Sequence, residues 1–200
     1  HMINLESGEL IKINRHSGPV SDIIFLPDSL YFLSLGISDK TLRINDVANT
    51  SVFKEFETRL ISLAVNPNGS VLVGGNEKGE LLFWDMDNMD NTKRYDDPLP
   101  NSPIHALEFD PSGRILAVGN EDGEVLMFSV KGNSLLHYYT LRGQDARINH
   151  IKFSNNGELL ATASFDGSVQ LWVLDEMEQM LPLAFRDHKD FVWNIEFSPD

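Results

Sequence analysis

The stretch that decides the fold runs Ile151-Lys152-Phe153-Ser154-Asn155-Asn156-Gly157-Glu158-Leu159-Leu160-Ala161-Thr162-Ala163. It reads as a short alternating strand, a turn and a second strand of small apolar residues. The opening five residues recur in equivalent form at 23–27, 63–67, 107–111 and 195–199. The copies begin 40, 44, 44 and 44 residues apart, so the chain is an internal repeat with a nearly constant period.

Each repeat predicts four strands. An Asx-Gly or Lys-Gly pair follows the second strand at 78–79, 122–123 and 166–167, and predicts two-residue hairpins. The third strand ends in an aromatic residue, as at Trp84, Phe128 and Trp172. The second strand is apolar on both faces, so neighbouring repeats must cover it. A repeat of about 40–45 residues that must stack predicts an all-β propeller.

At these positions the sequence resembles the WD40 repeat family. Trp84-Asp85 is the dipeptide that gives the family its name, and Trp172-Val173 keeps its tryptophan. Phe128-Ser129 and Asn45-Asp46 are degenerate copies. The resemblance implies about four complete four-stranded blades, at residues 15–56, 57–99, 100–142 and 143–186, and the start of a fifth at 187–200.

The family's blades are held by a buried tetrad of histidine, serine or threonine, aspartate and tryptophan. The resemblance implies such a set in the fourth unit, where Gln144 takes the histidine position, and only remnants in the others. We therefore expect a structural role, and not a catalytic one, for Gln144, Thr162, Asp166, Trp172, Trp84, Asp39 and Asp122.

Residues 1–8 are interpreted as a cloning remnant and lead-in, and residues 9–200 as a partial propeller. In the family, a strand such as 9–14 becomes the outer strand of the last blade. The fifth copy supplies one inner strand, Val192–Phe197. Since unpaired strand edges attract other chains, we expect the remaining strands to come from a longer propeller of about six to eight blades or from another copy of the chain.

The composition argues against several partners. The chain has 16 basic and 30 acidic residues, a formal charge of −14, which disfavours nucleic acid and anionic membranes and favours a partner with a basic surface. Neither an apolar run long enough to cross a bilayer nor a signal peptide is evident. The absence of cysteine excludes disulfides and thiolate metal sites and fits a cytoplasmic location.

No motif indicates an enzyme, a metal or a cofactor. The six histidines lack metal-ligand spacing, and the acidic segment 85–91 fails the calcium-loop pattern at Met89. The glycines at 74–75 do not precede a helix, so a nucleotide loop is not supported. We expect no catalytic residue, no bound metal and no cofactor.

The remaining hypothesis is a binding surface. In the family, peptides and proteins are recognised by the loops and strand starts around one end of the channel. The equivalent positions here are His16, Ser21, Arg59, Ile61, His105, Arg147, Asn149, Phe191 and Trp193. Trp193 is the strongest candidate because tryptophan is enriched in binding hot spots, although packing between blades would also explain it.

The expected function is therefore a non-catalytic scaffold or sensor that binds a protein or peptide. The amino-acid sequence of the repeats around 163–168 and 185–188 resembles that of bacterial WD40 proteins, in which such arrays accompany signalling domains. Two alternatives stay open at this point: a propeller that binds a small ligand or metal, and an assembly part that oligomerises through exposed blade edges.

Overall fold

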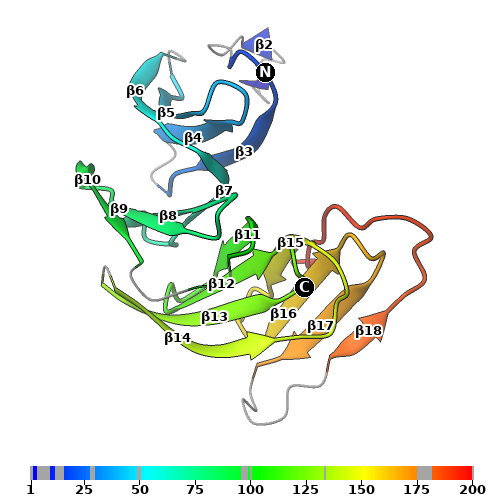
Figure 1. Ribbon diagram of the computed structural model, residues 1–200. Coiled ribbons are helices and arrows are strands. Elements are labelled where there is room, and N and C mark those ends of the chain that lie inside the picture. Colours follow the sequence, from blue (N-terminus) through cyan, green and yellow to red (C-terminus); the bar gives the residue numbers. More distant parts are fainter. Residues whose placement is uncertain are drawn as a thin grey trace. The chain divides into compact units, whose positions relative to one another are not determined.

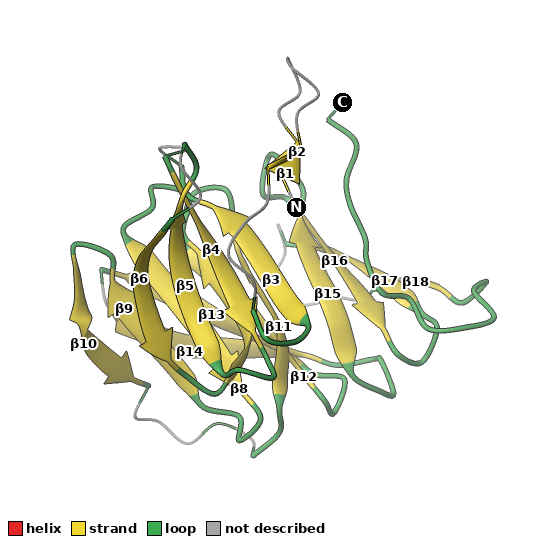
Figure 2. Cartoon of the chain, turned by 90° about the horizontal axis from the view of Figure 1, so that it is seen from above, coloured by secondary structure: helices red, strands yellow, loops and turns green. Residues whose placement is uncertain are grey.

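The computed structural model describes residues 2–3, 10–11, 16–27, 30–48, 51–95, 99, 101–132, 134–174 and 182–199. Within these ranges the chain is all-β and has no helix, and hence no helix that could cross a membrane. Four antiparallel sheets of four strands follow one another along the chain (Figures 1 and 2). The predicted fold class is confirmed.

The strands of each sheet pair in the order of the sequence. The first sheet contains β3 (Val20–Phe25), β4 (Tyr31–Gly36), β5 (Thr41–Asp46) and β6 (Val52–Glu57). The second contains β7 (Leu60–Val65), β8 (Val71–Asn76), β9 (Leu81–Asp85) and β10 (Asn88–Arg94). The third contains β11 (Ile104–Phe109), β12 (Ile115–Asn120), β13 (Val125–Lys131) and β14 (Ser134–Leu141). The fourth contains β15 (Ile148–Phe153), β16 (Leu159–Ser164), β17 (Val169–Val173) and β18 (Leu183–Phe185).

The hairpins between the second and third strands are one residue longer than predicted. In the second sheet Asn76 N–H donates to Glu80 O (3.2 Å) and Gly79 N–H donates to Asn76 O (3.2 Å), which encloses a three-residue loop. Only the glycine has a positive φ, 77° at Gly79, as in hairpins whose last loop residue is left-handed. The expectation of two-residue turns was wrong because one left-handed residue, and not two, closes these loops.

The chain forms two compact units, residues 1–61 and 62–200. In the second unit, apolar side chains of adjacent sheets form continuous cores: Val73 and Phe83 pack with Ile104, Leu116 and Phe128. A second core joins the third and fourth sheets and includes Met127, Ile148 and Trp172.

The close approach of these sheets depends on small residues in the second strand. A Cβ added at Gly119 of β12 would lie 2.6 Å from Ile148 Cγ2 of the next sheet. Five of the six residues of β12 are buried, as the sequence of an apolar second strand predicts.

The structure departs from the expectations for both ends of the sequence. Within the expected strand 9–14, only β2 (Leu10–Ile11) lies in the described residues, and it pairs with β1 (Met2–Ile3) and with no blade. Residues 192–197 are not a β-strand: among the described residues they do not join any sheet through backbone pairing. They run beside β15 and β16 instead, where Val192 N–H donates to Ser164 O at 3.1 Å.

Candidate functional site

Three aromatic rings and one arginine form a cluster at the end of the fourth sheet. The rings of Phe165 and Phe191 are stacked, with centroids 3.5 Å apart and planes 9° apart. Trp193 meets Phe165 edge-on at 5.8 Å. The guanidinium carbon of Arg147 lies 4.6 Å from the Phe165 centroid and 5.7 Å from the Trp193 ring. We call Arg147, Phe165, Phe191 and Trp193 the aromatic–arginine cluster.

The cluster remains open to solvent on its outer side. Trp193 is 63% exposed and Phe191 is 44% exposed, although each contacts its neighbours. A large aromatic side chain that is fixed by neighbouring rings and still exposed is typical of interaction hot spots.

Backbone and side-chain hydrogen bonds hold Arg147 in place. Phe165 N–H, in the hairpin between β16 and β17, donates to Arg147 O at 2.9 Å. Arg147 Nε donates to Asn149 Oδ1 at 2.8 Å, and Asn149 Nδ2 donates to Val192 O at 2.8 Å. Asn149 therefore connects the arginine to the C-terminal segment that carries Phe191 and Trp193.

Side chains of β15 fix the rest of that segment. Ile195 N–H donates to His150 Nδ1 at 3.4 Å. Lys152 Nζ lies 3.2 Å from Glu108 Oε1 and 3.5 Å from Glu196 Oε1, so the ammonium of the fourth repeat bridges carboxylates of the third and the fifth.

Burial and charge shift the pKa values along this row. Burial raises the pKa of Glu108, and the Lys152 ammonium only partly offsets it. For Lys152, burial favours the neutral amine, but Glu108 and Glu196 outweigh it and raise the pKa. Burial, with the nearby Lys152 charge, lowers the pKa of His150, which keeps Nδ1 available as an acceptor.

His105 lies on β11, in the third sheet. Its Nε2 lies 2.6 Å from Glu121 Oε2. Burial lowers the pKa of His105, the positive charge of Arg147 lowers it further, and Glu121 and Glu77 act in the opposite direction.

The predicted surface residues divide between the two units. His105, Arg147, Asn149, Phe191 and Trp193 all belong to the second unit, and the last four lie in or directly beside the cluster. Phe165 was missed by sequence reasoning because it lies in a segment interpreted only as a turn. Its position at the hairpin tip, equivalent to Glu77 and Glu121, is the signal that could have identified it.

The other predicted surface residues lie in the first unit. Ser21 donates to Leu35 O at 3.4 Å, Ile61 is half-buried, and Arg59 is exposed. The His16 side chain is only 3% exposed and both its ring nitrogens are engaged, so it is not available to a partner.

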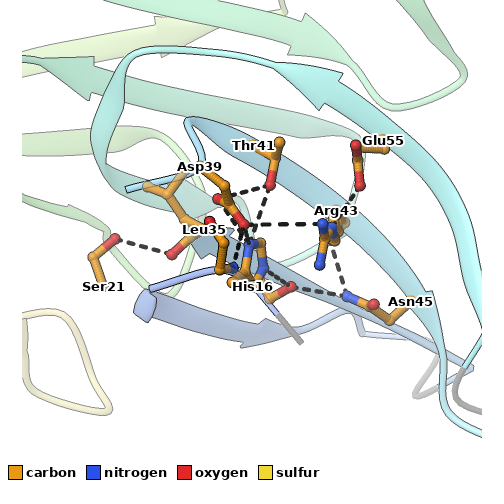
Figure 3. Close-up of polar contacts among 10 residues, drawn as sticks. His16, Ser21, Leu35, Asp39, Thr41, Arg43, Asn45 and Glu55 are labelled. Atoms are coloured by element: carbon orange, nitrogen blue, oxygen red, sulfur yellow. Dashed lines mark hydrogen bonds and ion pairs between the residues drawn. The ribbon is translucent and has the colours of Figure 1, made fainter. Parts of the chain in front are cut away.

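His16 is the centre of a buried polar network (Figure 3). Its Nδ1 lies 3.0 Å from Asp39 Oδ2 and its Nε2 lies 2.8 Å from Ser34 Oγ. Asn45 Nδ2 donates to the same Ser34 oxygen at 3.0 Å, in the place of the family's tryptophan. The first unit thus has a complete relay, meaning a chain of side-chain hydrogen bonds that joins Asp39, His16, Ser34 and Asn45. The sequence predicted a nearly complete set only in the fourth unit. The first unit also has one because the amide N–H of an asparagine can replace the indole N–H of a tryptophan.

The network also sets the protonation of its aspartate. Burial alone would raise the pKa of Asp39, but the Ser17 N–H, His16 and Thr41 donate to its carboxylate and hold the pKa at about 2. The carboxylate is therefore ionised throughout the neutral range.

In the fourth sheet the relay runs through a glutamine. Trp172 Nε1 donates to Thr162 Oγ1 at 3.4 Å, and Thr162 donates to Gln144 Oε1 at 2.7 Å. Gln144 Nε2 then donates to Ser168 Oγ at 3.1 Å. Asp166 makes no bond to Gln144; it accepts the Ser168 N–H (2.7 Å) and the Asp145 N–H (2.8 Å), and these bonds hold its pKa low against the effect of burial.

The second and third sheets have no such relay among the described residues. Trp84 is buried, at 5% exposure, and the Asp122 side chain is exposed. Asn120 Oδ1 holds the third sheet's hairpin, accepting from Asp122 N–H (3.1 Å) and Glu124 N–H (2.9 Å). The structural role expected for Asp122 is therefore taken in this hairpin by Asn120.

The described ranges contain no group of three or more His, Asp or Glu side chains placed to hold a metal ion. The surface offers stacking, cation–π contacts and hydrogen bonds, which are the interactions of recognition.

Comparisons with known proteins agree with this fold. The sequence model described as "WD domain, G-beta repeat" matches residues 8–46, 94–129 and 136–173. A curated relative, "Periodic tryptophan protein 2 homolog" from Schizosaccharomyces pombe, is 33% identical over 89 residues, which is 42% of this chain and 10% of that protein. The chain therefore spans about a tenth of that relative's length.

The relative is eukaryotic, so the expected likeness to bacterial arrays is not borne out. The family matches cover more than half of the sequence and coincide with the first, third and fourth sheets. The chain belongs to the WD40 repeat family.

Proposed function

We propose that this chain is a non-catalytic interaction module that binds a partner protein through the aromatic–arginine cluster. The observation that carries this proposal is the exposure of Trp193, 63%, beside an arginine whose position is fixed by two rings. Repeats of this family are typically protein-interaction scaffolds and generally lack catalytic activity.

The net negative charge of the chain favours a partner with a basic surface. A formal charge of −14 attracts basic surfaces over long range and accelerates their association. We therefore propose a partner whose surface is basic around the contact, and we expect the association rate to fall as salt concentration rises.

A display selection tests the proposal. Protein fragments displayed on phage are selected against the immobilised chain, and each selected fragment is then measured against Trp193→Ala and Leu136→Ala. Leu136 is the matched control, because it is 64% exposed but lies on β14, outside the cluster. We expect Trp193→Ala to weaken binding by about tenfold or more, and Leu136→Ala to leave it unchanged. Equal affinities for both variants would refute the assignment of this surface.

A second candidate function is assembly through sheet faces. On β3, Ile23 is 57% exposed and Phe25 is 56% exposed. Their counterparts on β11, Leu107 and Phe109, are 8% and 6% exposed, because a neighbouring sheet covers them. We propose that another sheet, from the same protein or from a second copy, covers β3 in the assembled state. Light scattering across a concentration series, with Phe25→Asp as the variant, measures whether copies associate through this face.

A further inference from the structure

Arg147 differs from three other described arginines, each of which lies beside a carboxylate of the chain. Arg43 lies beside Glu55 and Asp39, Arg94 beside Glu80, and Arg142 beside Glu124. Arg147 is half-buried, yet none of the described residues brings a carboxylate within 4.0 Å of it. The chain has 30 acidic and 16 basic residues. Even so, Arg147 lacks the carboxylate partner that the other three arginines have.

The orientation of the guanidinium is nevertheless fixed. Phe165 and Trp193 contact it, and Nε donates to Asn149 Oδ1 at 2.8 Å. The two terminal nitrogens carry four N–H bonds for which the described residues provide no acceptor. A planar fork of donors held by rings matches the two oxygens of a carboxylate.

The positive charge of Arg147 extends to its neighbours. It is the second-largest cause, after burial, of the lowered pKa of His105. Arg147 and His105 therefore lie close enough for their charges to interact.

We propose that Arg147 binds the side-chain carboxylate of an Asp or Glu in an extended segment of the partner protein. An apolar side chain next to that carboxylate lies on Phe191 and Trp193. The inference rests on the proposed function and adds the identity of the recognised group: one acidic residue beside an apolar one, within a partner surface that is otherwise basic. Charge complementarity with the unpaired guanidinium is the reason for choosing a carboxylate.

An oriented peptide array tests the choice. Peptides of about eleven residues carry Glu, Asp, Gln, Asn, phosphoserine or Lys at a fixed central position, Leu or Phe next to it, and mixed residues elsewhere. The Glu and Asp pools should bind at least about tenfold more tightly than the Gln and Asn pools. A preference for phosphoserine over both acids, or for Lys, would overturn the proposal.

Variants of the arginine separate charge from geometry. Arg147→Gln should abolish the preference for Glu over Gln, while Arg147→Lys should keep only part of it, because an ammonium lacks the planar fork. Arg114→Gln is the matched control: it removes the same charge from an exposed position in the same unit and should leave the preference intact. Tryptophan fluorescence of each variant verifies that it is folded.

A double-mutant cycle distinguishes this inference from the proposed function. Arg147→Gln is measured against paired peptides with central Glu or Gln, and Trp193→Ala against the same pair. If Trp193→Ala weakens all peptides but the effects of Arg147→Gln and Glu→Gln are additive, the surface binds and the carboxylate assignment is wrong. If neither variant affects any selected peptide, the proposed function itself fails.

Discussion

Replacing Thr162 by valine isolates the energetic contribution of the glutamine relay in the fourth sheet. Valine has nearly the same shape as threonine, so no cavity forms. The substitution leaves Gln144 Oε1 and Trp172 Nε1 without the Thr162 hydroxyl, to which they are bonded at 2.7 and 3.4 Å. Both residues are buried, at 6% and 2% exposure, so water cannot replace the lost partner.

The expected loss follows from these two bonds. An unsatisfied buried polar group costs about 1–3 kcal/mol, and the long bond to Trp172 contributes at the lower end. We therefore expect the free energy of unfolding to fall by about 2–3 kcal/mol.

Urea unfolding followed by tryptophan fluorescence measures this loss. All three tryptophans, Trp84, Trp172 and Trp193, lie in the second unit, so the signal reports that unit. The slope of the transition should stay constant while its midpoint decreases. Thr92→Val, at an exposed position on β10, is the control and should change stability by about 0.5 kcal/mol or less. If Thr162→Val is as stable as the control, the relay contributes no stability and the reasoning is refuted.

Three other predictions concern the sheets. Gly119→Ala places a Cβ 2.6 Å from Ile148 Cγ2, so it should cost about 1–3 kcal/mol by urea unfolding, and less when combined with Ile148→Ala. Asp39 has a folded pKa of about 2 against an ordinary 3.8, so its contribution is present above about pH 4 and lost as pH falls toward 2. Thermal melts by circular dichroism should show that Asp39→Asn removes about 1 kcal/mol of this acid sensitivity, a value that allows for solvent screening. Lys152→Met leaves two carboxylates unpaired, so hydrogen exchange at the Val192 amide should accelerate.

Each of these has an outcome that contradicts it. A Gly119→Ala variant as stable as the native chain would mean that the sheets move apart freely. Identical acid profiles for the native and Asp39→Asn chains would show that the network does not hold the carboxylate. Equal acceleration by Lys131→Met, at an exposed position at the end of β13, would assign the Lys152 effect to charge alone.

Most of the strands and hairpins could be predicted from the internal repeat. Strands such as Leu159–Ser164 were predictable because they are apolar on both faces, and a glycine after them closes a hairpin in three of the four sheets. The first sheet shows the limit: Lys40, with φ of 55°, takes the left-handed position there, and no sequence rule favours lysine in that conformation.

The side-chain networks were less predictable, because they depend on which atoms meet in space. Ser34 was absent from the predicted set, yet its hydroxyl joins His16 to Asn45. Arg147 was placed on the surface by its repeat position, but its stacking on Phe165 depends on a hairpin tip from another part of the repeat. The segment 192–197 has the pattern of a strand and lacks one, since a strand requires a paired neighbour and not only a suitable sequence.

The left-handed glycines keep the backbone of three hairpin loops alike, although the residue at the tip of each loop differs. In the last three sheets, Gly79, Gly123 and Gly167 fix the path of the hairpin loop and leave its first residue outside the ladder. That residue is Glu77, Glu121 and Phe165 in turn, so its chemistry varies from acid to aromatic while the loop geometry stays the same. We therefore expect single substitutions at these tips to change the chemistry that the loop presents while its backbone path stays the same, which suits these positions to the grafting of a new specificity.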